Sequence, residues 1–192
     1  MINLKKKNEM PSLFSTHRFT VRRYTLDDES DLFEAAREST NEVSRFLPWC
    51  HADYCIEDSR SWLLTIDPNW NDQHAYGFAI FDNQTGNFLG GCGLNKIDEH
   101  PVANLGYWVR TSATGNGVAT ESTIGLARFG FLHLGLSRIE ILMSTQNRAS
   151  RTVAINSGAQ FEGTLRNRLN LHGENHDALM YSLTPEDMKT NQ

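Results

Sequence analysis

The sequence has few cysteines and no long apolar run, and these shortages exclude several classes of protein. Its three cysteines among 192 residues are odd in number and show no paired CxxC spacing, so we expect reduced thiols and no metal site. No stretch approaches the roughly 18 consecutive apolar residues of a membrane-spanning helix. The first residues also lack the apolar stretch and cleavage site of a secretory signal. We therefore expect a cytoplasmic protein that does not associate with membranes.

The chain also lacks an excess of positive charge. Its 18 Lys and Arg residues are outnumbered by 23 Asp and Glu residues, which gives a formal net charge of -5. Proteins that bind duplex nucleic acid normally present a basic surface, so nucleic acid is not an expected partner. A composition of 39% hydrophobic and 21% charged residues is that of an ordinary globular protein, and the length suits one domain.

The first part of the chain predicts one strand followed by two helices. Residues 18–24 place apolar side chains two apart, as one face of a strand requires. Thr25 is a typical N-cap, and a helix over 26–38 is expected after it. A second helical stretch is expected to end at Asp67, because the residue before Pro68 disfavours the helical conformation. Both helices are expected before the first hairpin.

The rest of the chain predicts a meander and then alternating helices and strands. The runs 74–82, 88–98 and 102–110 are rich in β-forming residues and are separated by turn-forming links. A helix over 117–134, a strand over 138–144, a helix over 147–158 and an antiparallel pair of strands around His172–Gly173 are expected to follow. A strand, a helix and a strand in succession predict a parallel pair with a right-handed crossover. The predicted fold class is therefore α+β.

The most informative segment joins the strand at 102–110 to the helix that begins at Val118. Gly115 and Gly117 lie in this loop, and glycines let an anion approach the unpaired N–H groups at the start of a helix. A Walker loop would need Lys and then Ser or Thr where Val118 and Ala119 stand, and a dinucleotide fingerprint would need a third glycine. The loop is therefore a candidate cradle for a pyrophosphate held by backbone amides. The alternative, that the glycines only permit a tight turn, stays open.

Three segments carry a resemblance to a known family: GYWVRTSATGNGVATES at 106–122, RIEILMS at 138–144 and NRASRTVAINSGAQFEGTL at 147–165. They resemble the GNAT superfamily of acetyl-CoA-dependent N-acetyltransferases, and most of all the branch that acetylates the N-terminal amine of ribosomal proteins. The resemblance implies a single domain over 17–185, with tails at 1–16 and 186–192. It also implies a central mixed, largely antiparallel sheet of six to seven strands flanked by about four helices, with strands that splay apart at the cofactor site.

The resemblance further implies that acetyl-CoA binds at the glycine loop and along the strand before it. In the family, backbone groups of the loop hold the pyrophosphate, and the pantetheine arm pairs with the strand backbone. Thr114 stands where the family usually has Gln or Arg, so one side-chain contact is missing while the backbone cradle is retained. The implied cofactor-binding residues are Trp108, Val109, Gly115, Asn116, Gly117, Val118, Ala119, Thr120, Asn147 and Ser150.

The implied chemistry is attack of a neutral amine on a thioester, which needs a base for the amine and an acid for the leaving thiolate. Ser150 resembles the residue that donates a proton to the sulfur in this branch, and Asn147 would orient it. Each residue also has a plainer interpretation, since Ser is common in a first helical turn and Asn is a good N-cap. Both interpretations of Asn147 can hold together.

The general base is where the sequence departs from the family. Asn104 and Leu169 stand where relatives carry carboxylates. Four other titratable residues remain as candidates, although each is expected to be solvated: Glu99, His100, His172 and His176. An α-amine has a pKa near 8, about two units below that of lysine, so water can serve as its base. The missing carboxylate therefore favours an α-amine acceptor.

The main prediction is transfer of an acetyl group from acetyl-CoA to a primary amine, with the N-terminal α-amine of a ribosomal protein as the favoured acceptor. Two alternatives stay open: an enzyme acting on a small amine such as a polyamine, an amino acid or an antibiotic, and a non-catalytic sensor of acetyl-CoA. Phe46 and Trp49 are candidates to line the acceptor cleft, although aromatics beside Pro48 also fit a packed corner. A homodimer is a further option.

Overall fold

The structure is a computed structural model that describes residues 10–97 and 99–189. Within these residues, eight strands form one sheet in the order β1-β2-β3-β4-β5-β6-β8-β7. The strands are β1 (Leu13–Ser15), β2 (Phe19–Arg23), β3 (Ala75–Asp82), β4 (Phe88–Ile97), β5 (Val102–Val109), β6 (Arg138–Ser144), β7 (Gln160–Leu171) and β8 (Glu174–Leu183). All neighbours are antiparallel except β5 and β6, which are parallel. The α+β class, the meander and the crossover are confirmed.

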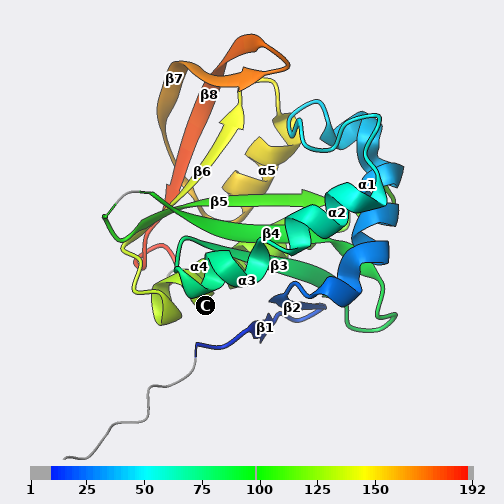
Figure 1. Ribbon diagram of the computed structural model, residues 1–192. Helices are drawn as coiled ribbons and strands as arrows, with labels where there is room; N and C mark the ends of the chain where they lie inside the picture. The colour runs from blue at the N-terminus through cyan, green and yellow to red at the C-terminus, as the bar shows by residue number, and fades with distance from the viewer. Residues whose placement is uncertain (1–9, 98, 190–192) are drawn as a thin grey trace, which may run out of the picture.

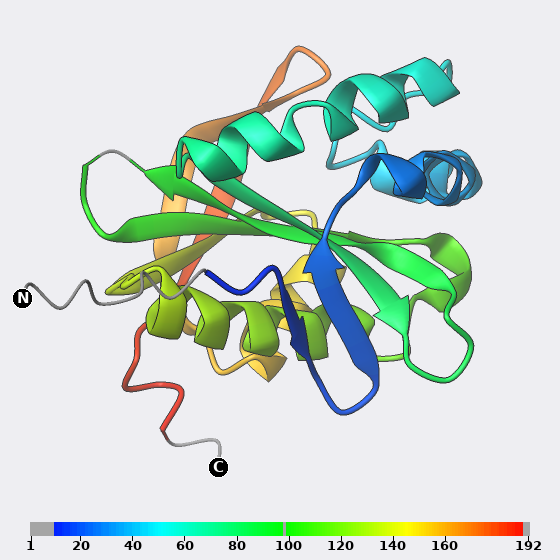
Figure 2. The same ribbon diagram turned by 60° about the horizontal axis from the view of Figure 1, so that its bottom comes forward.

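Five α-helices lie on the two faces of the sheet within the described residues (Figure 1). They are α1 (Glu29–Val43), α2 (Ile56–Leu63), α3 (Ile66–Asn71), α4 (Val118–His133) and α5 (Arg148–Asn156), with short 3-10 turns η1 (Leu26–Asp28) and η2 (Thr111–Ala113). Figure 2 shows α1, α2 and α3 on one face of the sheet and α4 and α5 on the other. In the described part of the chain, no helix is long and apolar enough to cross a membrane. All three cysteines are free thiols.

β1 lies within residues 1–16, for which the sequence predicts a tail. It pairs with β2, so a hairpin precedes both early helices, contrary to expectation. The Phe14 ring packs edge-on against Phe78 at a centroid distance of 5.5 Å, and this contact holds the short strand on the sheet. β1 brings the strand count to eight, one more than the upper expectation. The domain limits stay predictions, and residues 1–9 and 190–192 of the tails lie outside the described residues.

Two helix boundaries also differ from the expected ones. The helix after Thr25 begins as η1 and continues as α1 to Val43, beyond the expected end at residue 38. Its cap is the expected one, because the backbone N–H of Thr25 donates to Asp28 Oδ2 at 2.8 Å. The predicted end before Pro68 is wrong, since Pro68 lies in the first turn of α3. The N–H that proline lacks has no intrahelical partner in a first turn, so the ring is tolerated there.

The crossover helix α4 approaches the sheet closely because Gly130 faces it. A Cβ at Gly130 would lie 3.0 to 3.1 Å from side-chain atoms of Leu136, Ile139 and Leu94. Leu94 and Ile139 are fully buried at this contact. The contact fixes α4 against β4 and β6, and thereby positions the loop that leads into α4.

Candidate active site

β5 and β6 share only three residue pairs before they diverge. Pairing runs from Val102 with Arg138 to Asn104 with Glu140, after which β5 continues beside β4 and β6 continues beside β8. Figure 1 shows the two strands opening apart from their common start. The splayed strands expected at the cofactor site are therefore present, and Asn104 is the last paired residue before the gap.

The glycine loop lies where β5 leads into α4. Gly115 and Gly117 have φ values of +77° and +76°, a left-handed conformation that glycine adopts without strain. Gly117 is the N-cap of α4, and a Cβ at Gly115 would meet no heavy atom within 4 Å. The first N–H groups of α4 lack intrahelical partners and carry the positive end of the helix dipole. An anionic pyrophosphate therefore fits against this open backbone.

The other predicted loop residues differ in what they can offer a ligand. Val118 is 3% exposed and packs into the core, so only its backbone is available. Asn116 bonds within the loop, where its side-chain amide lies 3.4 Å from the carbonyl oxygens of Ala113 and Thr114. Thr114, the departure from the family pattern, donates its hydroxyl to a carbonyl in η2 at 2.8 Å. The loop thus presents mainly backbone groups.

Arg18 places a positive charge beside this loop, and sequence reasoning missed it. It precedes β2 and pairs with Glu121, 103 positions later in the first turn of α4, with Nε 2.9 Å from Oε2. A Cβ on Gly117 would lie 2.9 Å from Arg18 Nη2. No local spacing in the sequence could have linked Arg18 to the loop, because the contact depends on how the β1–β2 hairpin packs on α4.

Helix α1 holds the segment between β5 and the glycine loop. Ser39 Oγ accepts the backbone N–H of Thr111 at 2.9 Å, and Glu38 Oε1 accepts that of Ser112 at 2.6 Å. Glu38 also forms an ion pair with Arg110. The Arg110 guanidinium, assisted by hydrogen bonds from Ser112, lowers the pKa of Glu38 to about 2. The entry to the loop is therefore anchored on a neighbouring element.

Replacing Glu38 by glutamine should lower the free energy of unfolding by about 1 kcal/mol at neutral pH, a modest effect because the ion pair is partly exposed and screened. The folded pKa lies below the ordinary 4.5, so this contribution is complete above pH 4.5 and is lost as the pH falls towards 2. Urea unfolding of both proteins from neutral to acid pH measures the difference, which should shrink at the acid end. Glu34→Gln, at an exposed position of α1, is the control. A difference that does not change with pH contradicts this account.

Ser150 and Asn147 lie at the start of α5, across the gap from β5. Asn147 Oδ1 accepts the backbone N–H of Ser150 at 3.0 Å, which confirms the N-cap interpretation. Tyr107, on the open part of β5, places its hydroxyl 2.8 Å from Ser150 Oγ, where either oxygen can donate, and 3.2 Å from the Ser150 carbonyl, to which its one proton can be donated instead. Burial raises the pKa of Tyr107 to about 12, so the phenol keeps its proton near neutral pH. Tyr107 was not identified from the sequence as a site residue.

The opposite face of β5 borders a cavity of about 250 Å³ beneath α2 and α3. Trp108 lines this cavity, as strand alternation requires when Tyr107 points to the other face. Trp49, from the link between α1 and α2, also lines it, and its ring meets Trp108 edge-on at a centroid distance of 5.4 Å. Phe46, the other expected acceptor residue, is not among the lining residues. The structure therefore brings Trp49, but not Phe46, to the cavity.

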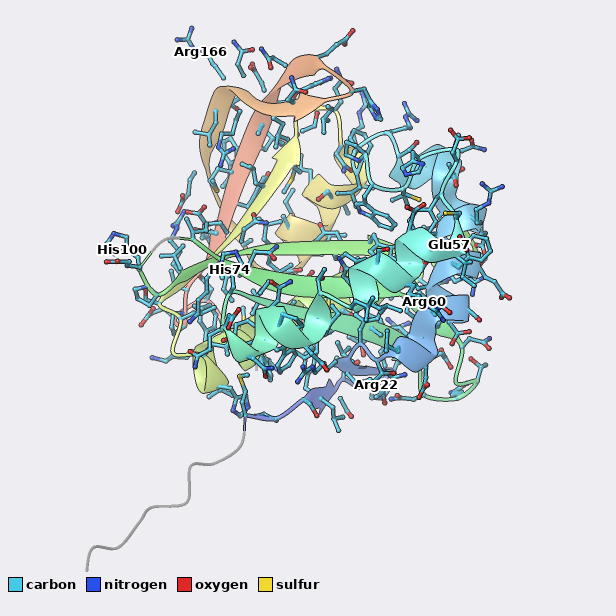
Figure 3. All side chains as sticks on the ribbon, in the orientation of Figure 1. Arg22, Glu57, Arg60, His74, His100 and Arg166 are labelled. Carbon is cyan, nitrogen blue, oxygen red and sulfur yellow. The ribbon has the colours of Figure 1, made fainter. Side chains whose placement is uncertain are left out.

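The four candidate bases lie outside this cavity. Glu99 and His100 are exposed and precede β5, at the far end of that strand from the glycine loop, and Figure 3 shows His100 pointing away from the molecule. His172 Nε2 donates to a backbone carbonyl of the α1–α2 link at 2.8 Å, and His176 pairs with Leu169 in the β7–β8 ladder. Among the described residues, the cavity lining contains no carboxylate or imidazole. The same residues contain no cluster of His, Cys, Asp or Glu that could hold a metal ion.

Comparison with known proteins agrees with this geometry. A family model described as an acetyltransferase (GNAT) domain matches residues 18–160. The uncharacterised N-acetyltransferase p20 of Bacillus licheniformis is 30% identical over 172 residues, which cover 88% of this chain and 93% of the relative. Mycobacterium smegmatis RimJ, solved with a CoA disulfide, has a TM-score of 0.84 at 21% identity, with coverage of 94% of this chain and 89% of RimJ.

A second solved structure is RimL, a ribosomal L7/L12 alpha-N-protein acetyltransferase in complex with coenzyme A. It has a TM-score of 0.81 at 21% identity, with coverage of 91% of this chain and 97% of RimL. The family model spans most of the chain, and the structure contains the splayed strands and the glycine loop to which the family resemblance assigns acetyl-CoA. The chain therefore belongs to the GNAT acetyltransferase family and is an acetyl-CoA-dependent N-acetyltransferase.

Proposed function

We propose that this enzyme acetylates the N-terminal α-amine of a protein, and that the acceptor is a ribosomal protein. The observation that carries the proposal is the cavity beside Trp108, whose described lining offers no carboxylate or imidazole to deprotonate an amine. An α-amine, with a pKa near 8, is partly neutral at physiological pH, whereas a lysine amine with a pKa near 10.4 is almost wholly protonated. The name of RimL, a ribosomal L7/L12 alpha-N-protein acetyltransferase, adds support for a ribosomal acceptor. Cytoplasmic location and a homodimer stay predictions from the sequence.

In this proposal, residues on both sides of the gap have defined tasks. Backbone groups of residues 115–120 hold the pyrophosphate, and those of Trp108 and Val109 align the pantetheine arm, which carries the acetyl thioester. Ser150 donates its hydroxyl proton to the sulfur as the carbon–sulfur bond breaks. Either hydroxyl can be the donor between Tyr107 and Ser150 Oγ, and in this proposal Tyr107 turns its single proton to Ser150 Oγ rather than to the Ser150 carbonyl. The Ser150 hydrogen is then free to point into the gap. Asn147 fixes the backbone of Ser150.

A panel of acceptors tests the proposal. Peptides with a free N-terminal Ser or Ala should be acetylated, and mass spectrometry should place the acetyl group on the α-amine. The same peptides with a blocked N-terminus and an internal lysine are the control and should remain unmodified. Acetylation of spermidine or a free amino acid in preference to the peptides would identify a small-amine enzyme instead. Binding of acetyl-CoA without transfer to any amine would identify a sensor.

A further inference from the structure

Three glycines form a row across the middle of the sheet, on the face covered by α2 and α3. Gly77 on β3 pairs with Gly93 on β4, and Gly93 pairs with Gly106 on β5. Paired residues on adjacent strands direct their side chains to the same face, so this row leaves a strip of sheet without side chains. All three glycines line the cavity described above, and the row forms its floor.

Packing accounts for two of these glycines but not for the third. A Cβ at Gly77 would lie 2.9 Å from Ile66 Cδ1, and one at Gly93 would lie 3.0 Å from the Tyr76 carbonyl oxygen. A Cβ at Gly106 would meet no heavy atom within 4 Å. Gly106 also lies outside the set of glycines with positive φ, so its backbone accepts other residues. Its missing side chain therefore keeps the cavity open without serving the packing of the fold.

The walls of the cavity are aromatic and uncharged. Tyr24, Trp49, Trp62 and Trp108 line it, and the amides of Asn69 and Asn95 supply neutral polar groups. None of the described lining residues carries a charge. Transfer of a charged side chain into such surroundings without a partner costs several kcal/mol, whereas an apolar group gains by leaving water. An apolar protein cavity of about 150 Å³ holds a benzene molecule, so a cavity of about 250 Å³ has room for a ring.

We propose that this cavity binds the side chain of the acceptor's first residue, that it takes an uncharged side chain as large as an aromatic ring, and that Gly106 sets the size limit. The inference rests on the proposed function and narrows its substrate class. The cavity borders β5 at Gly106 and Trp108, next to the gap, so a side chain held there leaves the α-amine facing the thioester side of β5.

Peptides that differ only in their first residue test the inference, with Ala, Phe, Asp or Lys at that position. For the parent enzyme we expect kcat/KM for the Phe peptide to equal or exceed that for Ala, and to exceed those for Asp and Lys by about tenfold or more. Gly106→Val should lower kcat/KM for the Phe peptide by about tenfold or more and change that for Ala by less than about threefold. For Gly106→Ala, kcat/KM for the Phe peptide should lie between the values for the parent enzyme and for Gly106→Val. Thermal melting and CoA affinity of each variant confirm that the fold and the cofactor site are retained.

Equal losses on every peptide in Gly106→Val, with CoA affinity unchanged, would overturn the inference while leaving the proposed function intact. A kcat/KM for the Asp peptide that matches that for the Phe peptide in the parent enzyme would also overturn the inference and leave the proposed function intact. If the parent enzyme acetylates no peptide, the proposed function fails, and calorimetry of peptide binding still decides about the cavity. In that case the Phe peptide must bind more tightly than the Asp peptide, and Gly106→Val must remove the difference; any other result refutes the assignment.

Discussion

Replacing Gly117 by valine is expected to weaken the binding of CoA by tenfold or more, about 1.4 kcal/mol or greater. Gly117 is the N-cap of α4 at φ +76°, a conformation that costs an L-residue about 1 to 2 kcal/mol and a β-branched one more. A relaxed valine would turn the loop away from the left-handed conformation and displace the N–H groups that face the pyrophosphate. The added Cβ would also lie 2.9 Å from Arg18 Nη2, but that flexible end can move. Isothermal titration calorimetry with CoA measures the change.

Gly86→Val is the matched control for this prediction. Gly86 has a nearly identical φ of +73°, and a Cβ there would meet nothing within 4 Å. Gly86 lies in the β3–β4 turn and not in the loop before α4, so a valine there introduces the same backbone strain outside the proposed pyrophosphate site. Both variants should lose a similar amount of stability, and only Gly117→Val should lose affinity for CoA. Equal CoA affinity in Gly117→Val and the parent would place the pyrophosphate elsewhere.

The elements that the sequence predicts well are those whose signals are local. The helix before Gly135, the hairpin at Gly86 and the strand–loop–helix junction at Gly115 each depend on residues close together in the chain, and the structure has them at the expected places. The strand β1 is missed because three residues are too short for a periodic pattern and are held by the distant ring of Phe78. The end predicted at Pro68 fails because the new helix α3 begins there and accepts proline in its first turn.

The candidate site also contains parts that the sequence predicts and parts that it does not. The glycine loop and the N-cap at Asn147 can be predicted from the sequence because each is a contiguous motif. The contact of Tyr107 with Ser150 joins two elements 43 positions apart, and Arg18 reaches its loop over a longer distance still. The sequence alone does not show that the three glycines of the row are neighbours, because only the pairing register of β3, β4 and β5 aligns them. Chemistry that depends on register and on splayed strands therefore has to be taken from the structure.

Removal of the Ser150 hydroxyl should have the largest effect on turnover. Ser150→Ala is expected to lower kcat by about 100-fold, the lower range for loss of a general acid, with the Kd for acetyl-CoA nearly unchanged. Tyr107→Phe should lower kcat by about tenfold, because Ser150 Oγ loses its hydroxyl partner at 2.8 Å, which in the proposed arrangement donates to it and leaves the serine proton for the gap. The double variant should be no slower than Ser150→Ala, since both changes remove one function. Steady-state rates at saturating acetyl-CoA, measured on an acceptor that the parent uses, provide all three values.

A leaving-group test separates this role from a structural one. An acetyl thioester whose thiol is more acidic than that of CoA leaves without help from an acid, so Ser150→Ala and Tyr107→Phe should both approach the parent rate with it. Tyr181→Phe is the control, because Tyr181 is also buried beside α5 but accepts from Arg151 Nε at 3.3 Å. It should leave kcat within about twofold of the parent with either thioester, as expected for loss of one long hydrogen bond outside the gap. If Tyr107→Phe lowers kcat equally with both thioesters, the tyrosine only supports the packing between β5 and α5. If Ser150→Ala leaves kcat unchanged, Ser150 has no catalytic role and is an ordinary polar residue in the first turn of its helix.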